Sequence, residues 1–430
     1  MSEKLFIDFH IHSRFSRATS KEITVENLAR WAQIKGLTVL GTGDFTHPGW
    51  LKELKENLEP VEPGLYKIKS QKVKGKNNNG FIADGRETRF ILSSEISCIY
   101  SKNNRVRKIH ILVLSPTFEA VEKINSRLEF IGNLKADGRP ILGLDAKELL
   151  KIVLQVSPAS IVIPCHAWTP WFSIFGSKSG FDSLEECFED YSRYVYAAET
   201  GLSSDPAMNW RLSSLDKITL ISNSDSHSLR KIGREANVFD IELSYRSIME
   251  AIKLKDPKKF LYTIEFFPEE GKYHFDGHRL CNVCLSPAES KKHGNLCPVC
   301  GKPLTIGVLN RVEELADRPE GAKPSLVIPF KHLVPLEEII AEALGMLPGA
   351  KKVDAEYQLL IKKFGNEFNI LLEASQLELQ AATLPEIAEG ISRVRDGKVI
   401  IDPGYDGVFG KVRIFNQGEQ KSICKQRALF

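Results

Sequence analysis

The sequence predicts an α/β barrel followed by a four-cysteine zinc ribbon and a small helical domain. Over residues 1–268, short apolar runs alternate with helix-like segments. Several of these runs lead into a histidine, aspartate or glutamate, as in barrels that carry their site at the carboxyl ends of the strands. Two Cys-x2-Cys pairs follow within residues 269–316. A proline-rich connector, residues 317–335, then leads to helical apolar patterns in residues 336–415 and to a flexible polar tail, residues 416–430.

The N-terminal run, residues 4–9, is apolar and aromatic like a buried strand, and it carries the HxH pair His10 and His12 at its end. Side chains alternate along a strand, so both imidazoles are expected on one face, where they can bind one ion. Residues 24–35 have the pattern of a helix that ends at Gly36. The chain therefore begins with a strand and a helix, as a barrel requires.

Further metal-binding side chains lie in or near strand-like runs. Asp225 and His227 repeat the geometry of the HxH pair after one such run. Imidazoles and carboxylates together suit zinc, manganese or iron. A single histidine beside an apolar strand is also typical of a hydrogen-bonded core residue, and Asp44 in a Gly-Asp turn can serve only the backbone. The candidate ligands are His10, His12, Asp44, His47, Glu95, His110, His166, Asp225 and His227.

These motifs resemble those of the polymerase and histidinol phosphatase (PHP) superfamily, whose metal site begins with HxH and ends with DxH on a distorted seven-stranded (βα) barrel. The resemblance covers about residues 1–265. It implies one metal held by His10, His12, Glu95 and Asp225, a second held by Glu95, His110 and His166, and a third held in part by His47 and His227. Many trinuclear members carry another histidine shortly after HxH, whereas residues 13–17 here are Ser-Arg-Phe-Ser-Arg. Two or three zinc or manganese ions are therefore expected.

The two cysteine pairs, Cys281 with Cys284 and Cys297 with Cys300, are separated by twelve residues and have the spacing of a structural zinc site. A disulfide framework is the alternative, but the sequence carries no sign of secretion, so we expect a cytoplasmic protein. No apolar run is long enough for a membrane span. Because such a ribbon has little core, it depends on its metal to fold and is expected to present a surface to a partner.

Two segments near the predicted metal site favour a nucleic-acid substrate. Lysines in residues 67–80 either lie on a solvated hairpin or follow a phosphate backbone. The aromatic residues 167–180 form either a packed lid or a platform for an unpaired base. Arg211 and Arg234 are candidate phosphate clamps or merely solvated, and the net charge of +3 requires any basic surface to be local. The candidate DNA-binding residues are Lys69, Lys72, Lys74, Lys76, Trp168, Trp171, Lys178 and Arg211.

The C-terminal domain carries one further motif. Residues 345–349, between its first two helical patterns, read Gly-Met-Leu-Pro-Gly. They resemble a helix-hairpin-helix loop, whose amides hold a DNA phosphate, but the usual second glycine is missing, and a plain interhelical turn is the alternative. Residues 398–415 are predicted to form a terminal β-hairpin.

In this order, the PHP barrel, the ribbon and the helical domain resemble the endonuclease Q family over nearly the whole chain. The resemblance implies a DNA repair endonuclease that cuts 5′ to uracil, hypoxanthine and xanthine, and at abasic sites. The candidate catalytic residues are then Glu95, Asp225 and Glu199. Glu95 and Asp225 would stand beside the nucleophilic water, with Glu199 behind the ligands or in the base pocket. A phosphatase of a small phosphorylated metabolite is the alternative, which the lysine-rich insertion and the ribbon disfavour. A noncatalytic DNA-binding scaffold is disfavoured by the nearly complete ligand set.

The last five residues suggest a second partner. They resemble the Gln-x-x-Leu-Phe peptide with which bacterial DNA enzymes bind the sliding clamp, and Gln426, Leu429 and Phe430 stand at the matching positions. An accidental apolar end is the alternative. A peptide on a mobile tail can reach a partner while the enzyme stays on DNA, so we expect weak clamp binding.

Overall fold

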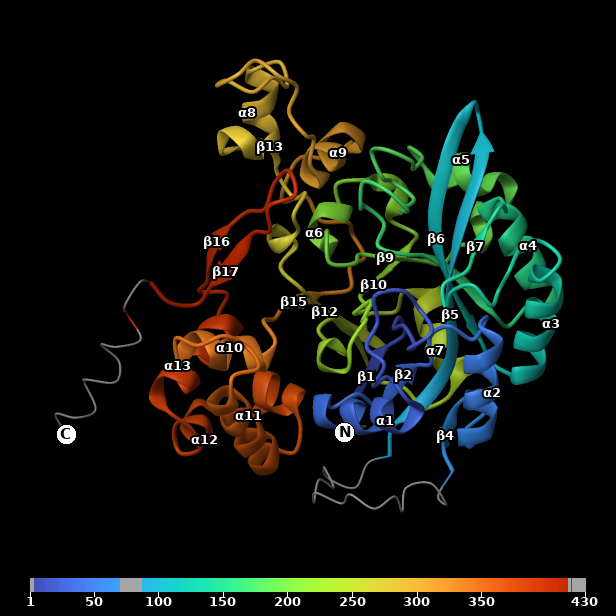
Figure 1. Ribbon diagram of the computed structural model, residues 1–430, viewed down its shortest axis with the longest axis horizontal. Helices are drawn as coiled ribbons and strands as arrows, with labels where there is room; N and C mark the ends of the chain where they lie inside the picture. The colour runs from blue at the N-terminus through green and yellow to red at the C-terminus, as the bar shows by residue number, and fades with distance from the viewer. Residues whose placement is uncertain (1–3, 70–86, 417–418, 420–430) are drawn as a thin grey trace.

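The computed structural model describes residues 4–69, 87–416 and 419. Figure 1 shows the barrel on the right, the cysteine-containing module at the upper left and the C-terminal helices at the lower left. The predicted α/β class and the order of the modules are therefore present in the molecule. Within the described residues, no helix is long and apolar enough to cross a membrane.

One mixed sheet forms the main part of the barrel. β1 (Leu5–Asp8) pairs in parallel with β2 (Val39–Gly41), which pairs in parallel with β5 (Arg89–Lys102). On its other edge, β1 pairs antiparallel with β11 (Ala236–Phe239), and β11 pairs antiparallel with β12 (Phe260–Glu265). Antiparallel neighbours therefore interrupt the parallel strand-helix alternation of a regular barrel.

The longest strands, β5 and β6 (Arg105–Ser115), form an antiparallel hairpin that projects from the barrel (Figure 1). Glu95 lies inside this hairpin, opposite Leu112. Its carboxylate is thus presented from mid-strand, which corrects the expectation that it stands at a strand's carboxyl end. β6 also pairs with β8 (Ile161–Pro164), so the chain segment after β8 is brought next to the hairpin.

The remaining barrel elements are short. β9 (Ala197–Glu199) and β10 (Thr219–Ile221) form a separate parallel pair. The predicted first helix is confirmed, because its N-cap Thr24 accepts from the backbone of Asn27 and Gly36 ends it in the left-handed conformation at φ 89°. The other elements are β3 (Leu58–Pro60), β4 (Tyr66–Ile68), β7 (Ile141–Leu142), α1 (Val25–Lys35), α2 (Pro48–Asn57), α3 (Phe118–Leu128), α4 (Ala146–Val156), α5 (Leu184–Phe188), α6 (Pro206–Asn209) and α7 (Tyr245–Leu254).

The cysteine-containing module is small. It consists of β13 (Asp276–His278), β14 (Val283–Leu285) and α8 (Pro287–Lys292), and α9 (Val308–Leu315) leads out of it. Its buried apolar cluster contains only Val283, Cys297 and Leu304 among the described residues. So little buried area supplies little folding energy, which fits a module that needs a metal.

The C-terminal helices pack against the barrel through a buried ion pair. Lys35 of α1 lies 2.6 Å from Glu367, whose carboxylate also accepts from the Tyr357 hydroxyl at 2.6 Å. Within the expected connector, β15 (Phe330–His332) pairs in parallel with β12 and thus extends the barrel sheet. The helical elements are α10 (Leu336–Ala343), α11 (Lys351–Phe364), a π-helical turn (Asn369–Glu373), α12 (Gln376–Gln380) and α13 (Pro385–Arg395).

The predicted terminal hairpin is present as β16 (Ile400–Asp402) and β17 (Lys411–Arg413). It lies between the cysteine-containing module and the C-terminal helices (Figure 1). The Gly404 amide donates to the Glu269 carbonyl at 2.8 Å, and the Phe275 amide donates to the Gly404 carbonyl at 2.9 Å. The hairpin is therefore fastened to the segment that links the barrel to the module.

Candidate metal centre

Four ligand atoms converge beside β1. The Nε2 atom of His12 lies 3.1 Å from Asp225 Oδ1 and 3.2 Å from Glu95 Oε2. His10 Nε2 lies 3.6 Å from each of the same two oxygens. All four donors lie within 4.8 Å of one another, which is a separation that one metal ion can bridge.

A second cluster shares Glu95. Its other oxygen, Oε1, lies 2.6 Å from His110 Nδ1 and 3.2 Å from His166 Nε2. The two imidazole nitrogens are 3.3 Å apart. Each oxygen of Glu95 thus faces one cluster, which is the arrangement of a carboxylate that bridges two cations.

The histidines are oriented for metal binding. His10 Nε2 is buried and has no hydrogen-bond partner within the described residues, although an orphaned buried nitrogen is costly. Its other nitrogen, Nδ1, lies 3.0 Å from Glu199 Oε1, so the Glu199 carboxylate fixes the tautomer that leaves Nε2 as an acceptor. The donor set and this vacant nitrogen fit a cation, and zinc and manganese both suit it.

Glu199 orients ligands rather than meeting the reacting atoms. Besides His10, its carboxylate accepts from the His166 amide at 2.8 Å and from Asn223 Nδ2 at 2.9 Å. It is fully buried. The structure therefore places Glu199 behind the ligands and not in the base pocket. The prediction that Glu199 acts directly in catalysis is corrected, because His10, the His166 amide and Asn223 occupy its carboxylate. Cys165 lies beside this pair, and burial raises the pKa of its thiol well above the ordinary value.

Asp44 has a similar role and does not join either ligand cluster. It accepts from His12 Nδ1 at 3.1 Å, from the Ser13 amide at 2.6 Å and from Ser16 Oγ at 2.8 Å. These donors use the carboxylate fully. The Asp44 side chain therefore holds His12 in place. The prediction that Asp44 is a metal ligand is corrected, and its role is to position His12.

His47 and His227 do not converge on a third cation. His47 is the N-cap of α2, where its Nδ1 accepts from the Trp50 amide at 3.4 Å, and its ring stacks on Phe15 with centroids 4.3 Å apart. The His227 ring lies against His12 with centroids 4.4 Å apart. Across residues 4–69 and 87–416, no group of three ligand atoms includes either histidine. The described residues thus bring together the two ligand groups around Glu95, and neither includes His47 or His227.

The backbone is strained at three site positions. Asp44, His166 and Asp225 have φ values of 45°, 30° and 44°, which side-chain-bearing residues adopt at a cost. They follow the ends of β2, β8 and β10 within a few residues. Such strain persists because the surrounding hydrogen bonds determine the conformation.

The electrostatics favour charged carboxylates. Burial opposes the charged form of Glu95, but His110 and Arg139 outweigh it and hold the pKa of Glu95 well below its usual range. For Asp225, burial is likewise outweighed by His10 and His12, which lower its pKa. Burial lowers the pKa of His110 to about 4, so this imidazole is neutral at physiological pH. Anionic carboxylates beside a neutral imidazole are ready to accept cations.

Arg139 is a site residue that the sequence reasoning missed. Its Nη1 lies 3.0 Å from Glu95 Oε2, and its backbone amide donates to Asp137 at 3.1 Å. It lies in the loop after α3, where neither periodicity nor a motif distinguishes it. The only signal was the Asp-Gly-Arg-Pro turn, which is typical of many surface loops.

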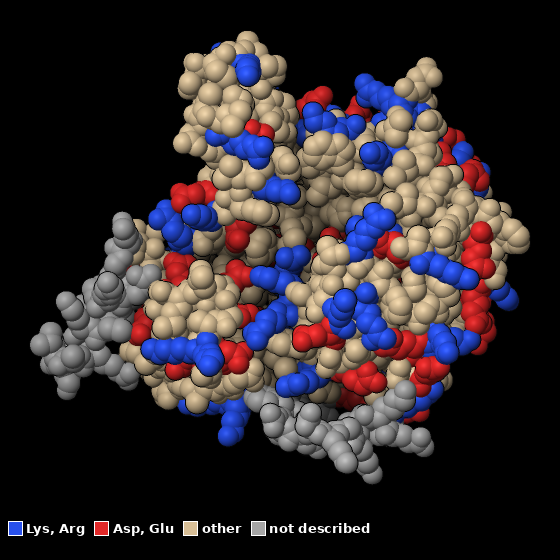
Figure 2. Space-filling view, viewed as in Figure 1, with Lys and Arg blue, Asp and Glu red and all other residues tan. Residues whose placement is uncertain are grey.

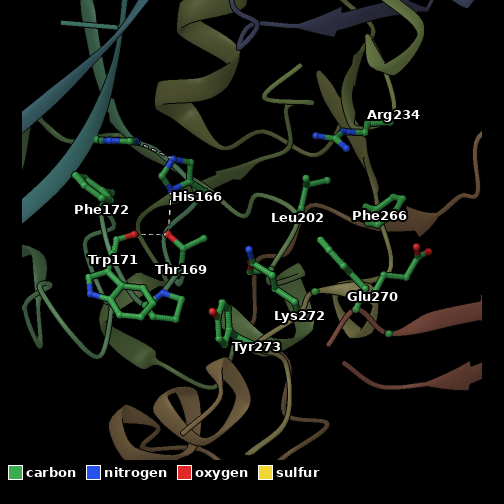
Figure 3. Close-up of a pocket in the computed structure, with 16 residues that line it drawn as sticks. His166, Thr169, Trp171, Phe172, Leu202, Arg234, Phe266, Glu270, Lys272 and Tyr273 are labelled. Atoms are coloured by element: carbon green, nitrogen blue, oxygen red, sulfur yellow. Dashed lines mark hydrogen bonds between the residues drawn. The ribbon is translucent and has the colours of Figure 1, made fainter. Parts of the chain in front are cut away.

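A cavity of about 750 Å³ opens beside the second cluster. His110 and His166 line one end of it, and the segment 270–273 and the hairpin residues Phe409 and Gly410 line the other. Figure 3 shows Trp171 and Phe172 on one side of the cavity and Arg234 on the opposite side. The cavity is therefore aromatic on one wall and cationic on another.

The two predicted stacking tryptophans differ. Trp171 is 44% exposed at the cavity. Trp168 is buried, and its Nε1 donates to Asn209 Oδ1 at 2.8 Å, so it belongs to the core and is corrected as a DNA contact. The sequence of this aromatic loop did not indicate which of the two tryptophans is buried and which is exposed.

The predicted cationic DNA contacts also differ in their environments. Lys178 is exposed on a groove with Arg105 and Arg107. Arg211 is buried and pairs with Glu313, which corrects it from phosphate clamp to a contact between the barrel and α9. Lys69 Nζ donates to the carbonyls of residues 55 and 56 at the end of α2. Lys72, Lys74 and Lys76 lie outside the described residues, as do Gln426, Leu429 and Phe430.

The cysteine-containing module has its own ligand cluster. Cys281, Cys297 and Cys300 converge with His278, whose Nδ1 lies 3.4 Å from Cys300 Sγ. Cys284 follows Val283 on β14, and because Val283 faces the small core, Cys284 points to the opposite face, with Sγ 3.8 Å from the Pro403 carbonyl. Structural zinc therefore has two candidate fourth ligands, Cys284 and His278.

Figure 2 shows that lysines and arginines border the hollow between this module and the barrel. A negatively charged chain lying in the hollow would meet this cationic border. The face thus offers cationic side chains to a nucleic-acid backbone.

Comparisons with known proteins agree with this architecture. Residues 335–398 match the family model described as the MJ0043 C-terminal domain. The chain is 34% identical over 255 residues to the uncharacterized protein MJ0043 of Methanocaldococcus jannaschii, and the match covers 57% of this chain and 31% of that relative. The chain thus spans about a third of the length of MJ0043.

Two solved structures are similar over nearly the whole chain. The lesion-specific endonuclease PfuEndoQ from Pyrococcus furiosus is 30% identical with a TM-score of 0.82, covering 96% of this chain and 95% of its own. Endonuclease Q in complex with a 27-mer duplex substrate that carries an abasic lesion at the active site is 30% identical with a TM-score of 0.81, covering 97% of this chain and 98% of its own.

Proposed function

Because this chain belongs to the endonuclease Q family, we propose that it is a metal-dependent DNA repair endonuclease that hydrolyses the phosphodiester 5′ to uracil, hypoxanthine, xanthine and abasic sites. The observation that carries the proposal is the pair of ligand clusters that share Glu95, because His110 and His166 of the second cluster line the 750 Å³ cavity. A cavity of that volume beside the ligands has room for one flipped nucleotide.

The residues divide the chemical work. Cations bound at the two clusters would supply a deprotonated water, neutralise charge on the phosphate and stabilise the leaving oxygen. Glu95 and Asp225 would hold those cations and flank the water, while Glu199 and Asp44 keep His10 and His12 correctly oriented. Protein groups thus fix the geometry before substrate arrives.

The cavity suits a flipped, deaminated base. Trp171 and Phe172 offer aromatic surfaces for stacking, and Arg234 and Lys272 offer donors for the carbonyl that deamination creates. Burial raises the pKa of Glu270, another lining residue, to about 8, so at neutral pH its carboxyl can both donate and accept. Cytosine or adenine would leave such groups unpaired, which discriminates strongly.

The test uses end-labelled duplexes that contain uracil, hypoxanthine, an abasic site or no lesion. The metal-loaded protein should cut 5′ to each lesion, leave 3′-hydroxyl and 5′-phosphate ends, and spare the normal duplex. Equal cutting of undamaged DNA would contradict the specificity. Hydrolysis of p-nitrophenyl phosphate without any action on oligonucleotides would instead indicate a metabolite phosphatase.

Clamp binding is a separate part of the proposal. It rests on the sequence of Gln426, Leu429 and Phe430 alone, and the expected affinity is in the micromolar range, about −8 kcal/mol. Deleting Leu429 and Phe430 should abolish binding to a bacterial clamp in a pull-down or calorimetric titration. Cleavage of short oligonucleotides should be unchanged by the deletion. Equal clamp binding by both forms would exclude the peptide.

A further inference from the structure

A permanent positive charge reaches the first ligand cluster. Arg139 Nη1 lies 3.0 Å from Glu95 Oε2. The same oxygen lies 3.2 Å from His12 Nε2 and 3.6 Å from His10 Nε2, so the guanidinium enters the first cluster directly. Residues 13–17 contain no histidine, and neither His47 nor His227 joins a ligand group in the described residues.

The loop that carries Arg139 is fixed to the site. The Gly138 amide donates to the Phe15 carbonyl at 3.0 Å, and its carbonyl accepts from Thr46 Oγ1 at 3.1 Å. A Cβ atom at position 138 would lie 2.2 Å from Asp44 Oδ2, so only glycine permits this approach. Asp44 also orients His12, and the same network therefore positions both the ligand and the arginine.

The other end of the loop is equally constrained. Asp137 accepts from the Arg139 amide at 3.1 Å through Oδ1, and its Oδ2 lies 3.1 Å from Arg17 Nε. Arg17 itself is 77% exposed, so it lies on the outer side of the same carboxylate. Asp137 thus joins the backbone of Arg139, whose side chain reaches the ligands, to the exposed guanidinium of Arg17.

Arg139 keeps most of its hydrogen-bonding capacity free. Within the described residues its guanidinium donates to Glu95 alone, although five N–H groups are available. Its side chain is 27% exposed, which leaves one edge open toward solvent. A guanidinium group stays protonated throughout the physiological pH range. The planar fork therefore stays charged and matches the geometry of a phosphate.

We propose that Arg139 supplies the third positive charge of the reaction centre by binding a non-bridging oxygen of the scissile phosphate. The inference rests on the proposed function. The oxygen of water bonds to phosphorus as the P–O3′ bond breaks, the water loses a proton, and the 3′-oxygen gains one. Arg139 remains protonated throughout and stabilises the charge that builds on the non-bridging oxygens.

The test compares Arg139→Gln and Arg139→Lys with the wild type in single-turnover cleavage of an abasic duplex. Arg139→Gln should be slower by about 10²–10³-fold, the usual loss for one transition-state donor. Arg139→Lys should retain an intermediate rate, because it keeps the charge without the fork. Bound manganese, measured on the protein alone by mass spectrometry, should be unchanged in both.

Two readouts separate a phosphate clamp from a structural role. Added guanidinium should partly restore cleavage by Arg139→Ala. A methylphosphonate in place of one non-bridging oxygen should slow the wild type strongly but add little to the defect of Arg139→Gln. Loss of bound manganese from the variants, full additivity with the methylphosphonate, or a wild-type rate for Arg139→Gln would each overturn the proposal.

A matched control isolates the effect of charge. Arg246 of α7 has an 86% exposed side chain and pairs only with Glu250 among the described residues, so Arg246→Gln removes one positive charge far from the ligands. Its cleavage rate should equal that of the wild type. If the wild type cuts no lesion at all, the proposed function fails. If it cuts and Arg139→Gln cuts equally fast, only the role of Arg139 fails.

Discussion

The barrel centre and the cysteine-containing module use similar ligands but position them in different ways. In the barrel, Glu199 and Asp44 hold His10 and His12 through hydrogen bonds, and a large apolar core surrounds these groups. In the module, the cysteines lie around a buried cluster of three residues, one of which is the ligand Cys297. We therefore expect the barrel site to be formed before metal binds, whereas the small core of the module makes its folding depend on metal.

This difference has a physical basis. Burying a carboxylate or imidazole is costly unless its partners are fixed, and the barrel supplies those partners from strands that are stable for other reasons. The module has no comparable set of contacts, so its metal contributes folding energy directly. Removing metal should thus abolish cleavage without unfolding the barrel, and it should unfold the module.

The largest expected effect comes from the barrel ligands. Asp225→Asn removes a charge that faces both His10 and His12, and lesion cleavage should fall by about 10³-fold or more, since several kcal/mol of transition-state stabilisation are lost. Circular dichroism and the melting temperature of the metal-free variant should remain close to those of the metal-free wild type. Near-normal turnover would show that Asp225 is not a ligand of the reaction centre.

A smaller effect is expected from the residue behind the ligands. Glu199→Gln keeps the size of the side chain but weakens its hold on His10 Nδ1, and metal affinity should drop by about 10–100-fold. Cleavage should recover when manganese is raised, because the ligands themselves remain. If the loss persists at saturating manganese, Glu199 acts on the reaction rather than on His10.

Changes in the module should act on binding rather than on chemistry. Cys297→Ser should release one zinc ion and abolish hydrogen-exchange protection in residues 276–305, while protection of β1 and β5 stays. DNA affinity should weaken by about tenfold, equivalent to 1.4 kcal/mol. Comparison of His278→Asn with Cys284→Ser then identifies the fourth ligand, because only one of these changes should release zinc. Unchanged zinc content in Cys297→Ser would exclude the cluster.

The smallest effect concerns a buried carboxylate away from the ligands. Burial raises the pKa of Glu265 from 4.5 to about 7, although the Thr263 and Thr200 hydroxyls donate to it. The folded state then binds more protons than the unfolded state between these values, so stability falls as pH rises through that window and levels off above it. Glu265→Gln should be more stable than the wild type by about 1–2 kcal/mol at pH 8 and similar to it near pH 4.5.

Urea titrations across this pH range measure the effect. The control Glu320→Gln, in an exposed turn, should follow the wild-type curve. Parallel curves for Glu265→Gln and the wild type would show that Glu265 titrates alike in the folded and unfolded states.

Local sequence patterns predicted much of the fold. The caps of α1, the HxH spacing on β1 and the helices after the connector are set by neighbouring residues, and each was predictable. The convergence of Glu95, His110 and His166 followed from the resemblance rather than from spacing, because these residues come from different strands and loops.

What the sequence could not give depends on long-range contacts. Trp168 and Trp171 are three positions apart in one aromatic loop, and only tertiary packing buries the first and exposes the second. Arg211 meets Glu313 at a separation of 102 residues, so no local pattern marks it as a domain contact. Arg139 reaches Glu95 from a loop whose place depends on the fit of Gly138 against Asp44.

The central claim is that two cations sharing Glu95 form the reaction centre. Anomalous diffraction from crystals grown with manganese and an abasic duplex tests it most directly. We expect one peak between His10, His12, Glu95 and Asp225, a second between Glu95, His110 and His166, and the phosphate 5′ to the lesion in contact with both. A lesion phosphate bound elsewhere, or a barrel without anomalous peaks in an active crystal, would contradict the account.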